Sequence, residues 1–173
     1  MTPSGYRRLI LTRHAKSSWD DPLMADIDRP LNARGHAAAR ELGDFLASRG
    51  YDPEEVLCSS ARRTRETWDE VARAALETRP ELRYLPELYH ATPEAMMAAL
   101  AQASAPTVMM IGHNPGIAEF AARLPAKPIY SGDFRKYPTC ATLIVEFQAE
   151  DWREVTVGSG AMLEFFTPSN RGR

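Results

Sequence analysis

Three short apolar runs, each followed by polar residues and then by a helical pattern, constrain the fold more than any other feature. They cover residues 9–11, 56–58 and 107–111. Apolar runs of this length that end at turn residues are typical of buried strands. Helices between successive strands favour parallel pairing, because a parallel crossover needs a long connection. The pattern therefore predicts parallel strands with helices packed on the sheet.

The intervening and later segments complete this expectation. Asn32 and Gly50 are suited to cap a helix over residues 33–49, and Thr92-Pro93 is suited to begin another. Further helices are predicted over residues 61–77 and 117–124, with loops at 17–31 and 125–139. Later strands are predicted at 141–147, 152–157 and 161–166, and a short one at 82–86. Strands that alternate with helices and then cluster predict an α/β fold, a three-layer α/β/α sandwich with a mostly parallel mixed sheet.

Length and composition limit the function classes. The chain has 173 residues and shows no repeat or linker, so we expect a single domain over residues 1–173. A net charge of −2 predicts no nucleic-acid partner and no binding to an anionic membrane. The first residues are too short and polar for a signal peptide, and no apolar stretch is long enough to span a membrane. We expect a cytoplasmic protein whose Cys58 and Cys140 are free thiols.

Polar residues that follow the three buried strands are the candidate functional residues. Arg13 and His14 follow the first strand, Ser59, Ser60 and Arg63 the second, and His113 the third. If these strands are parallel neighbours, their carboxyl ends open on one edge of the sheet, where ligands bind in open α/β folds. Guanidinium groups match phosphate oxygens, and imidazole is a competent nucleophile near neutral pH. These residue types together favour a phosphoryl group as the ligand.

The chain resembles the histidine phosphatase superfamily, which has the phosphoglycerate mutase-like fold. The matching segments are Arg13-His14-Ala15, the Ser-x-x-x-Arg-x-x-x-Thr pattern from Ser59 to Thr67, and Gly-His-Asn-Pro-Gly at residues 112–116. Residues 28–31 resemble the turn that precedes the superfamily's first helix. The Arg-His-Ala-Lys-Ser opening and residues 138–141 are most similar to the SixA-type phosphohistidine phosphatases.

The resemblance implies a covalent mechanism. His14 attacks phosphorus, a phosphohistidine forms, and water hydrolyses it, while Arg13, Arg63 and His113 hold the phosphoryl oxygens. Lys16 and Ser17 are candidates for contacting the substrate, and Glu87 is a candidate for the general acid. Asn114 stands where acid phosphatases of the superfamily have aspartate. The implied substrate is a phosphohistidine on a protein partner or a related phosphomonoester or phosphoramidate, and no cofactor is expected.

Several alternatives remain open at this point. A small-molecule phosphomonoesterase, a phosphoglycerate mutase-like enzyme and a module that only binds phosphate groups would use similar residues. Only about 20 residues separate Leu88 from Thr107, so we expect an open site without a large lid. The four histidines lack metal-ligand spacing, and we expect no metal. His36 is expected on a helix surface and His90 in a loop, with a place in the pocket lining as the alternative for His90. A cysteine phosphatase loop would need arginine where Thr64 stands.

Overall fold

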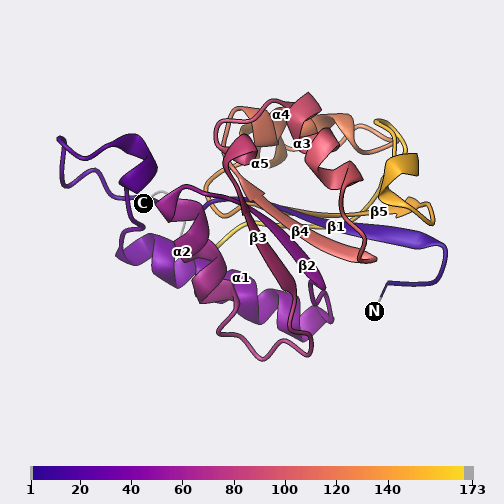
Figure 1. Ribbon diagram of the computed structural model, residues 1–173, viewed down its shortest axis with the longest axis horizontal. Coiled ribbons are helices and arrows are strands. Elements are labelled where there is room, and N and C mark those ends of the chain that lie inside the picture. Colours follow the sequence, from indigo (N-terminus) through magenta and orange to yellow (C-terminus); the bar gives the residue numbers. More distant parts are fainter. Residues whose placement is uncertain (1, 170–173) are drawn as a thin grey trace.

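A central six-stranded sheet organises the protein. The computed structural model describes residues 2–169 (Figure 1). The strand order is β3-β2-β4-β1-β5-β6. The strands are β1 (Tyr6–Arg13), β2 (Glu55–Ser59), β3 (Glu81–Leu85), β4 (Thr107–Gly112), β5 (Thr142–Gln148) and β6 (Ala161–Phe166). The first four strands are parallel, whereas β5 runs antiparallel to β1 and β6 antiparallel to β5. The prediction of a mixed, mostly parallel sheet is confirmed.

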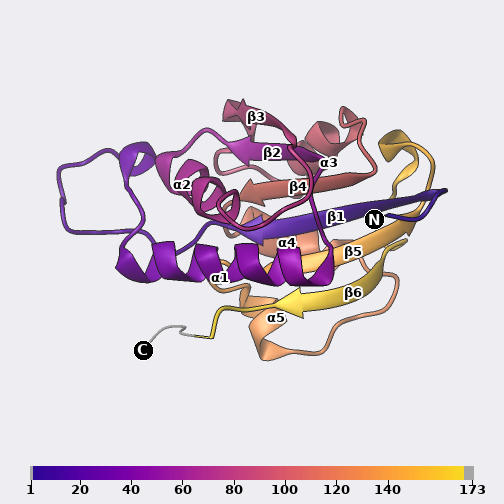
Figure 2. The same cartoon turned by 90° about the horizontal axis from the view of Figure 1, so that it is seen from below.

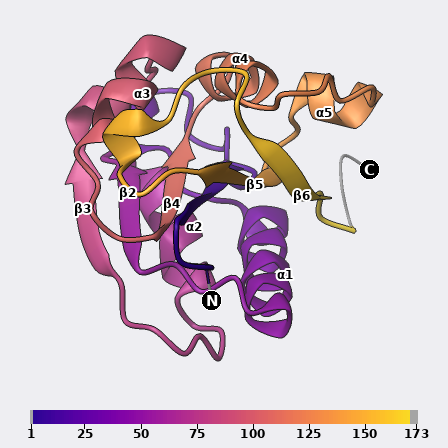
Figure 3. The same cartoon turned by 90° about the vertical axis from the view of Figure 1, so that its right-hand side faces the viewer.

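Helices cover both faces of the sheet (Figures 2 and 3). α1 (Ala33–Arg49) and α2 (Arg62–Val71) pack on one face, and α3 (Pro93–Ala101), α4 (Gly116–Arg123) and the short α5 (Gly132–Lys136) lie on the other. Successive side chains of a strand point to opposite faces. Leu9 and Leu11 therefore join the core beneath α3 and α4, while Ile10 joins the core beneath α1 and α2. This is the predicted three-layer α/β/α sandwich.

The amino end of α1 is fixed against the loop that follows β1. The Asn32 side chain accepts a hydrogen bond from the Gly35 backbone N–H at 2.9 Å, and the Asn32 backbone N–H donates to the Lys16 carbonyl at 3.0 Å. A Cβ atom at Gly35 would lie 2.1 Å from that same carbonyl oxygen, so only glycine permits this approach. The predicted cap is confirmed, and it positions the loop carrying His14.

The prediction of a helix up to residue 77 is wrong. α2 ends at Val71, and Ala72 and Ala75 beyond it are exposed. The chain turns there because later residues are tied to the segment that precedes β2. The Glu77 backbone N–H donates to Asp52 Oδ1 at 3.3 Å, and the Thr78 hydroxyl donates to the Pro53 carbonyl at 2.6 Å.

Two further elements differ from the prediction because tertiary contacts determine them. Residues 152–157 do not form a strand; a 3₁₀ helix spans Trp152–Glu154, and the Trp152 indole N–H donates to the Ala105 carbonyl at 2.6 Å. The expected loop at 125–139 contains α5, which the Ser131 side chain caps and the buried Phe134 anchors. No helix in residues 2–169 has the length and apolar character needed to cross a bilayer. The single-domain division stays a prediction.

Candidate active site

The carboxyl ends of β1, β4 and β2 open into one pocket of about 410 Å³. β4 lies between β1 and β2, so the three loops that were predicted to converge are neighbours. The pocket is lined by six of the predicted site residues: Arg13, His14, Lys16, Ser17, Arg63 and His113. It is also lined by His90, for which the sequence left this place open, and by five residues that the sequence did not assign to the site: Trp19, Asp26, Arg29, Asn114 and Thr139.

His14 is held at the end of β1 with one ring nitrogen occupied. Its backbone N–H donates to the Gly112 carbonyl at 3.0 Å, and its ring Nδ1 lies 2.6 Å from the Ala15 carbonyl oxygen. A carbonyl only accepts, so Nδ1 carries the ring proton and Nε2 keeps its lone pair. Burial holds the pKa of His14 well below its ordinary value, so the ring is neutral at physiological pH. These are the properties of a nucleophilic imidazole.

Arg13 and Arg63 bring two guanidinium groups to the pocket. Arg13 Nη1 donates to the Tyr137 carbonyl at 3.2 Å, and Arg63 Nη1 donates to the Asp26 carbonyl at 2.7 Å. The Nε atoms of both arginines are buried and have no hydrogen-bond partner among residues 2–169. Burial, with the neighbouring Arg63 charge, lowers the pKa of Arg13, yet a guanidinium stays protonated in proteins. The site therefore holds two permanent positive charges on side chains that line the pocket.

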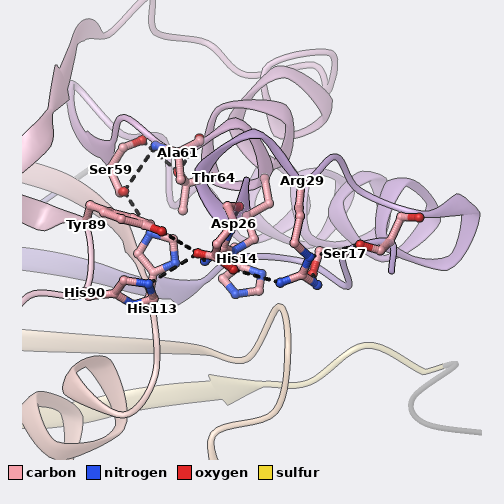
Figure 4. A network of polar contacts seen from close by, with 12 residues as sticks. His14, Ser17, Asp26, Arg29, Ser59, Ala61, Thr64, Tyr89, His90 and His113 are labelled. Atoms are coloured by element: carbon pink, nitrogen blue, oxygen red, sulfur yellow. Dashed lines mark hydrogen bonds and ion pairs between the residues drawn. The ribbon is translucent and has the colours of Figure 1, made fainter. Parts of the chain in front are cut away.

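His113 presents a second neutral imidazole. Its Nε2 lies 2.8 Å from the Ser59 hydroxyl, which itself accepts from the Ala61 backbone N–H at 3.3 Å (Figure 4). The single proton of Ser59 can therefore be donated to Nε2, which places the ring proton on Nδ1. That Nδ1 is buried and unpaired within the described residues. Burial and the nearby Arg63 charge lower the pKa of His113 to about 3, so it acts as a neutral donor.

A carboxylate that the sequence reading missed, Asp26, lies in the same pocket. It belongs to the 3₁₀ helix Asp26–Asp28, in the loop between β1 and α1. Its Oδ2 accepts from Arg63 Nη2 at 3.0 Å and from the Tyr89 hydroxyl, and it lies 3.3 Å from His90 Nε2 (Figure 4). Partial burial works to raise the pKa of Asp26, but hydrogen bonds from Tyr89, Arg63 and Arg29 outweigh it and hold that pKa far below its usual range.

Arg29 fixes this loop through three of its N–H groups. Its Nε donates to the Ser18 carbonyl at 3.0 Å, its Nη1 to Asp26 Oδ1 at 3.1 Å and its Nη2 to Ser17 Oγ at 2.5 Å. The guanidinium carbon also lies 3.3 Å from the centre of the Trp19 ring, a cation–π contact. The sequence identified residues 28–31 only as a turn, and the buried Arg29 is what orders the loop that presents Asp26.

Comparison with known proteins assigns the family. The chain matches the model of the histidine phosphatase superfamily (branch 1) over residues 9–88. It is 35% identical over 164 residues to an uncharacterised chloroplastic protein of Arabidopsis thaliana, covering 89% of this chain and 72% of that protein. The chain belongs to the histidine phosphatase superfamily. As the resemblance implied, it is a histidine-type phosphatase of SixA type.

Two solved structures are similar to this phosphatase over nearly their whole length. A protein of Nakamurella multipartitia assigned as the phosphohistidine phosphatase SixA has a TM-score of 0.78 and 27% identity, covering 97% of this chain and 99% of that one. A protein of Agrobacterium tumefaciens with the same assignment has a TM-score of 0.74 and 28% identity, covering 94% and 98%. The phosphoglycerate mutase-like α/β fold is therefore confirmed.

The structure does not bring Glu87, the candidate acid, into the pocket of this histidine phosphatase. Glu87 lies on the 3₁₀ helix Pro86–Leu88 with its side chain exposed, because the adjacent Leu88 takes the inward position. Lys16 and Ser17 do line the pocket, and their substrate contacts stay a prediction. Cys58 is a buried free cysteine, and burial raises the pKa of its thiol to about 12, which makes it a poor nucleophile. Within residues 2–169, no three His, Cys, Asp or Glu side chains are grouped to hold a metal ion.

The buried neutral histidines are expected to make this phosphatase less stable in acid. Folding lowers the pKa values of His14 and His113. Below pH 6.5 these histidines are therefore protonated in the unfolded chain but stay neutral in the folded chain, which favours unfolding. His113 alone should lower the free energy of unfolding by about 1.4 kcal/mol between pH 7.5 and pH 5.5, and His14 acts in the same direction. Urea unfolding at both pH values, on wild type and His113→Gln, measures this. The variant should lose about 1.4 kcal/mol less than wild type; an equal loss would show that His113 is protonated in the folded state.

Proposed function

We propose that this phosphatase hydrolyses phosphohistidine on a protein substrate through a phosphohistidine formed transiently on His14. The observation that carries the proposal is the geometry of His14: its Nδ1 lies 2.6 Å from the Ala15 carbonyl oxygen, which fixes the ring proton on Nδ1 and leaves the lone pair on Nε2. An imidazole fixed in this tautomer needs no further activation to attack phosphorus.

In the first step, His14 Nε2 forms a bond to phosphorus while the bond from phosphorus to the substrate nitrogen breaks. The electron pair of the broken bond leaves with the substrate imidazole. In the second step, water attacks the phosphorus on His14, and the electron pair of the N–P bond returns to Nε2. Both steps move negative charge onto the phosphoryl oxygens. Arg13, Arg63 and His113 line the pocket and are suited to stabilise that charge.

The substrate class is supported by two observations. The two similar solved structures are both assigned as phosphohistidine phosphatases, and their chains match this one almost from end to end. In addition, the rim of the pocket carries side chains that face solvent, among them Trp19 and Lys16. A pocket that opens at the surface admits a phosphoryl group attached to a large protein, which a closed cavity would exclude.

The test uses a protein phosphorylated on histidine with phosphoramidate and, in parallel, the same protein phosphorylated on serine. Phosphate release is measured for each, and the enzyme is quenched early to trap labelled phosphoenzyme. We expect faster release from phosphohistidine, with a label on the enzyme that is lost in acid and retained in base.

Other results would indicate a different function or a different nucleophile. Binding of both phosphoproteins without phosphate release would support a binding module. Release from aryl phosphates but not from phosphohistidine would move the substrate to small phosphomonoesters. A label that survives acid would place the nucleophile on another residue.

A further inference from the structure

The reaction also requires a proton donor for the leaving group when that group is basic. A phosphohistidine or p-nitrophenyl phosphate releases a stabilised leaving group, but a more basic leaving group, such as unsubstituted phenol or an ordinary alcohol, leaves readily only if it is protonated. Glu87, the carboxylate expected for this task, is exposed on the 3₁₀ helix outside the pocket lining. The proton must come from a group that reaches the pocket.

Asp26 is the carboxylate of the pocket, and it is bound in a way that keeps it ionised. Arg63 Nη2 donates to it at 3.0 Å and Arg29 Nη1 at 3.1 Å, and the Tyr89 hydroxyl donates to the same Oδ2. A carboxylate that accepts hydrogen bonds from two guanidinium groups strongly favours its charged form. Asp26 can therefore stabilise a neighbouring cation, but it has no proton to donate near neutral pH.

His90 is the titratable group that Asp26 faces at the pocket wall. Its Nε2 lies 3.3 Å from Asp26 Oδ2, and its side chain is 53% exposed, so it stays in contact with solvent protons. Its ring centre is 5.3 Å from that of His113 and 4.1 Å from that of Tyr89, which place the imidazole beside the anion-binding groups (Figure 4). His113 itself is buried and neutral and cannot serve as the proton source.

The backbone at His90 supports a positional role for this ring. Its φ of 52° lies in the left-handed region, which is uncommon for a residue with a side chain. Such conformations cost on the order of 1 kcal/mol or more and persist where surrounding contacts determine them. Here Tyr89 packs on the ring and Asp26 bonds to it, and the conformation directs the imidazole to the pocket lining.

We propose that His90 is a further catalytic residue, the general acid and base of the reaction, with Asp26 stabilising its protonated form. The inference rests on the proposed attack by His14. As Nε2 of His14 bonds to phosphorus, the leaving oxygen or nitrogen takes the bonding electron pair and a proton from His90. Neutral His90 then accepts a proton from the water that attacks the phosphorus on His14, which regenerates both residues. With this donor the enzyme accepts alkyl and aryl phosphomonoesters in addition to phosphoramidates.

The experiment compares two substrates that differ in leaving group, p-nitrophenyl phosphate and phenyl phosphate. His90→Asn removes the donor, and asparagine tolerates left-handed backbone. We expect kcat/KM to fall about 100-fold or more for phenyl phosphate and only a few-fold for p-nitrophenyl phosphate. A merely structural effect of the substitution would lower kcat/KM for both substrates by the same factor.

Matched variants separate the candidates. His36→Asn is the control, because His36 also contacts a carboxylate, Glu70, at 2.9 Å but lies outside the pocket. This variant should leave kcat/KM unchanged for both substrates. His90→Gly, which also suits the backbone, should regain phenyl phosphate turnover when imidazole is added. Glu87→Gln tests Glu87 as the general acid, and it should leave the ratio of the two kcat/KM values unchanged.

Two outcomes would overturn the role of His90: equal losses for both substrates in His90→Asn and His90→Gly, or a loss in Glu87→Gln that depends on the leaving group. Neither bears on His14. A failure of the proposed function would instead appear as a wild-type enzyme that forms no acid-labile phosphoenzyme with either substrate. The two failures are therefore distinguishable in one set of assays.

Discussion

His14→Asn is expected to lower kcat for aryl phosphate and phosphohistidine protein by about 10,000-fold or more. Asparagine retains an N–H that can donate to the Ala15 carbonyl, as His14 Nδ1 does at 2.6 Å, but it lacks the nucleophilic Nε2. The variant therefore preserves the local hydrogen bond while removing covalent catalysis. Stopped assays of phosphate release and trapping of labelled enzyme measure both consequences.

The anion-binding groups are untouched by this substitution, so ligand binding should survive the loss of turnover. Arg13, Arg63 and His113 still line the pocket, and calorimetry should detect phosphate binding by His14→Asn as by wild type. The unfolding midpoint serves as a check that the variant is folded. If His14→Asn still forms a phosphoenzyme that is labile in acid, another histidine is the nucleophile.

The arginine and histidine side chains that line the pocket were predictable because they follow regular elements. β1, β2 and β4 are continuous buried runs, and parallel strands necessarily end at the same edge of a sheet. Arg13, His14 and His113 stand where two of these runs end, and Arg63 stands on the second residue of the helix after β2. Hydrophobic pattern alone was enough to bring these four residues together.

Asp26 could not be found in this way, and His90 only as a loop residue that could line the pocket, because irregular segments present them. Asp26 lies in a loop without periodicity, and its place depends on the contacts of Arg29. His90 depends on a left-handed backbone that no local pattern indicates. One signal was available: a buried arginine such as Arg63 requires a counter-charge, and the aspartates of the 17–31 loop were candidates for it.

The errors in secondary structure have a similar origin. Residues 152–157 alternate in the way a strand does, but the Trp152 indole is drawn to the Ala105 carbonyl by a long-range hydrogen bond. The error for Glu87 is of the same kind. The family pattern made Glu87 the candidate acid, but the neighbouring Leu88 is buried and takes the inward position, so the Glu87 side chain faces solvent. Local sequence cannot rank such tertiary contacts against intrinsic preference.

Arg63→Gln is expected to reduce kcat/KM for p-nitrophenyl phosphate about 100- to 1,000-fold, the range for loss of one donor to a developing charge. Part of that loss should come from Asp26. In the wild type, Arg63 contacts both the Asp26 carbonyl, at 2.7 Å, and the Asp26 carboxylate, at 3.0 Å. Without the guanidinium, the carboxylate keeps its charge through Arg29 and Tyr89 and repels the incoming phosphate.

A double-mutant cycle isolates this repulsion. Asp26→Asn combined with Arg63→Gln removes the unbalanced negative charge, so the double variant should be more active than Arg63→Gln alone even though it carries one more substitution. The p-nitrophenyl substrate is chosen because it needs little protonation, which limits the effect of Asp26 on His90. Strictly additive losses would mean that Asp26 does not act on bound phosphate, and the guanidinium of Arg63 would then account for the whole effect.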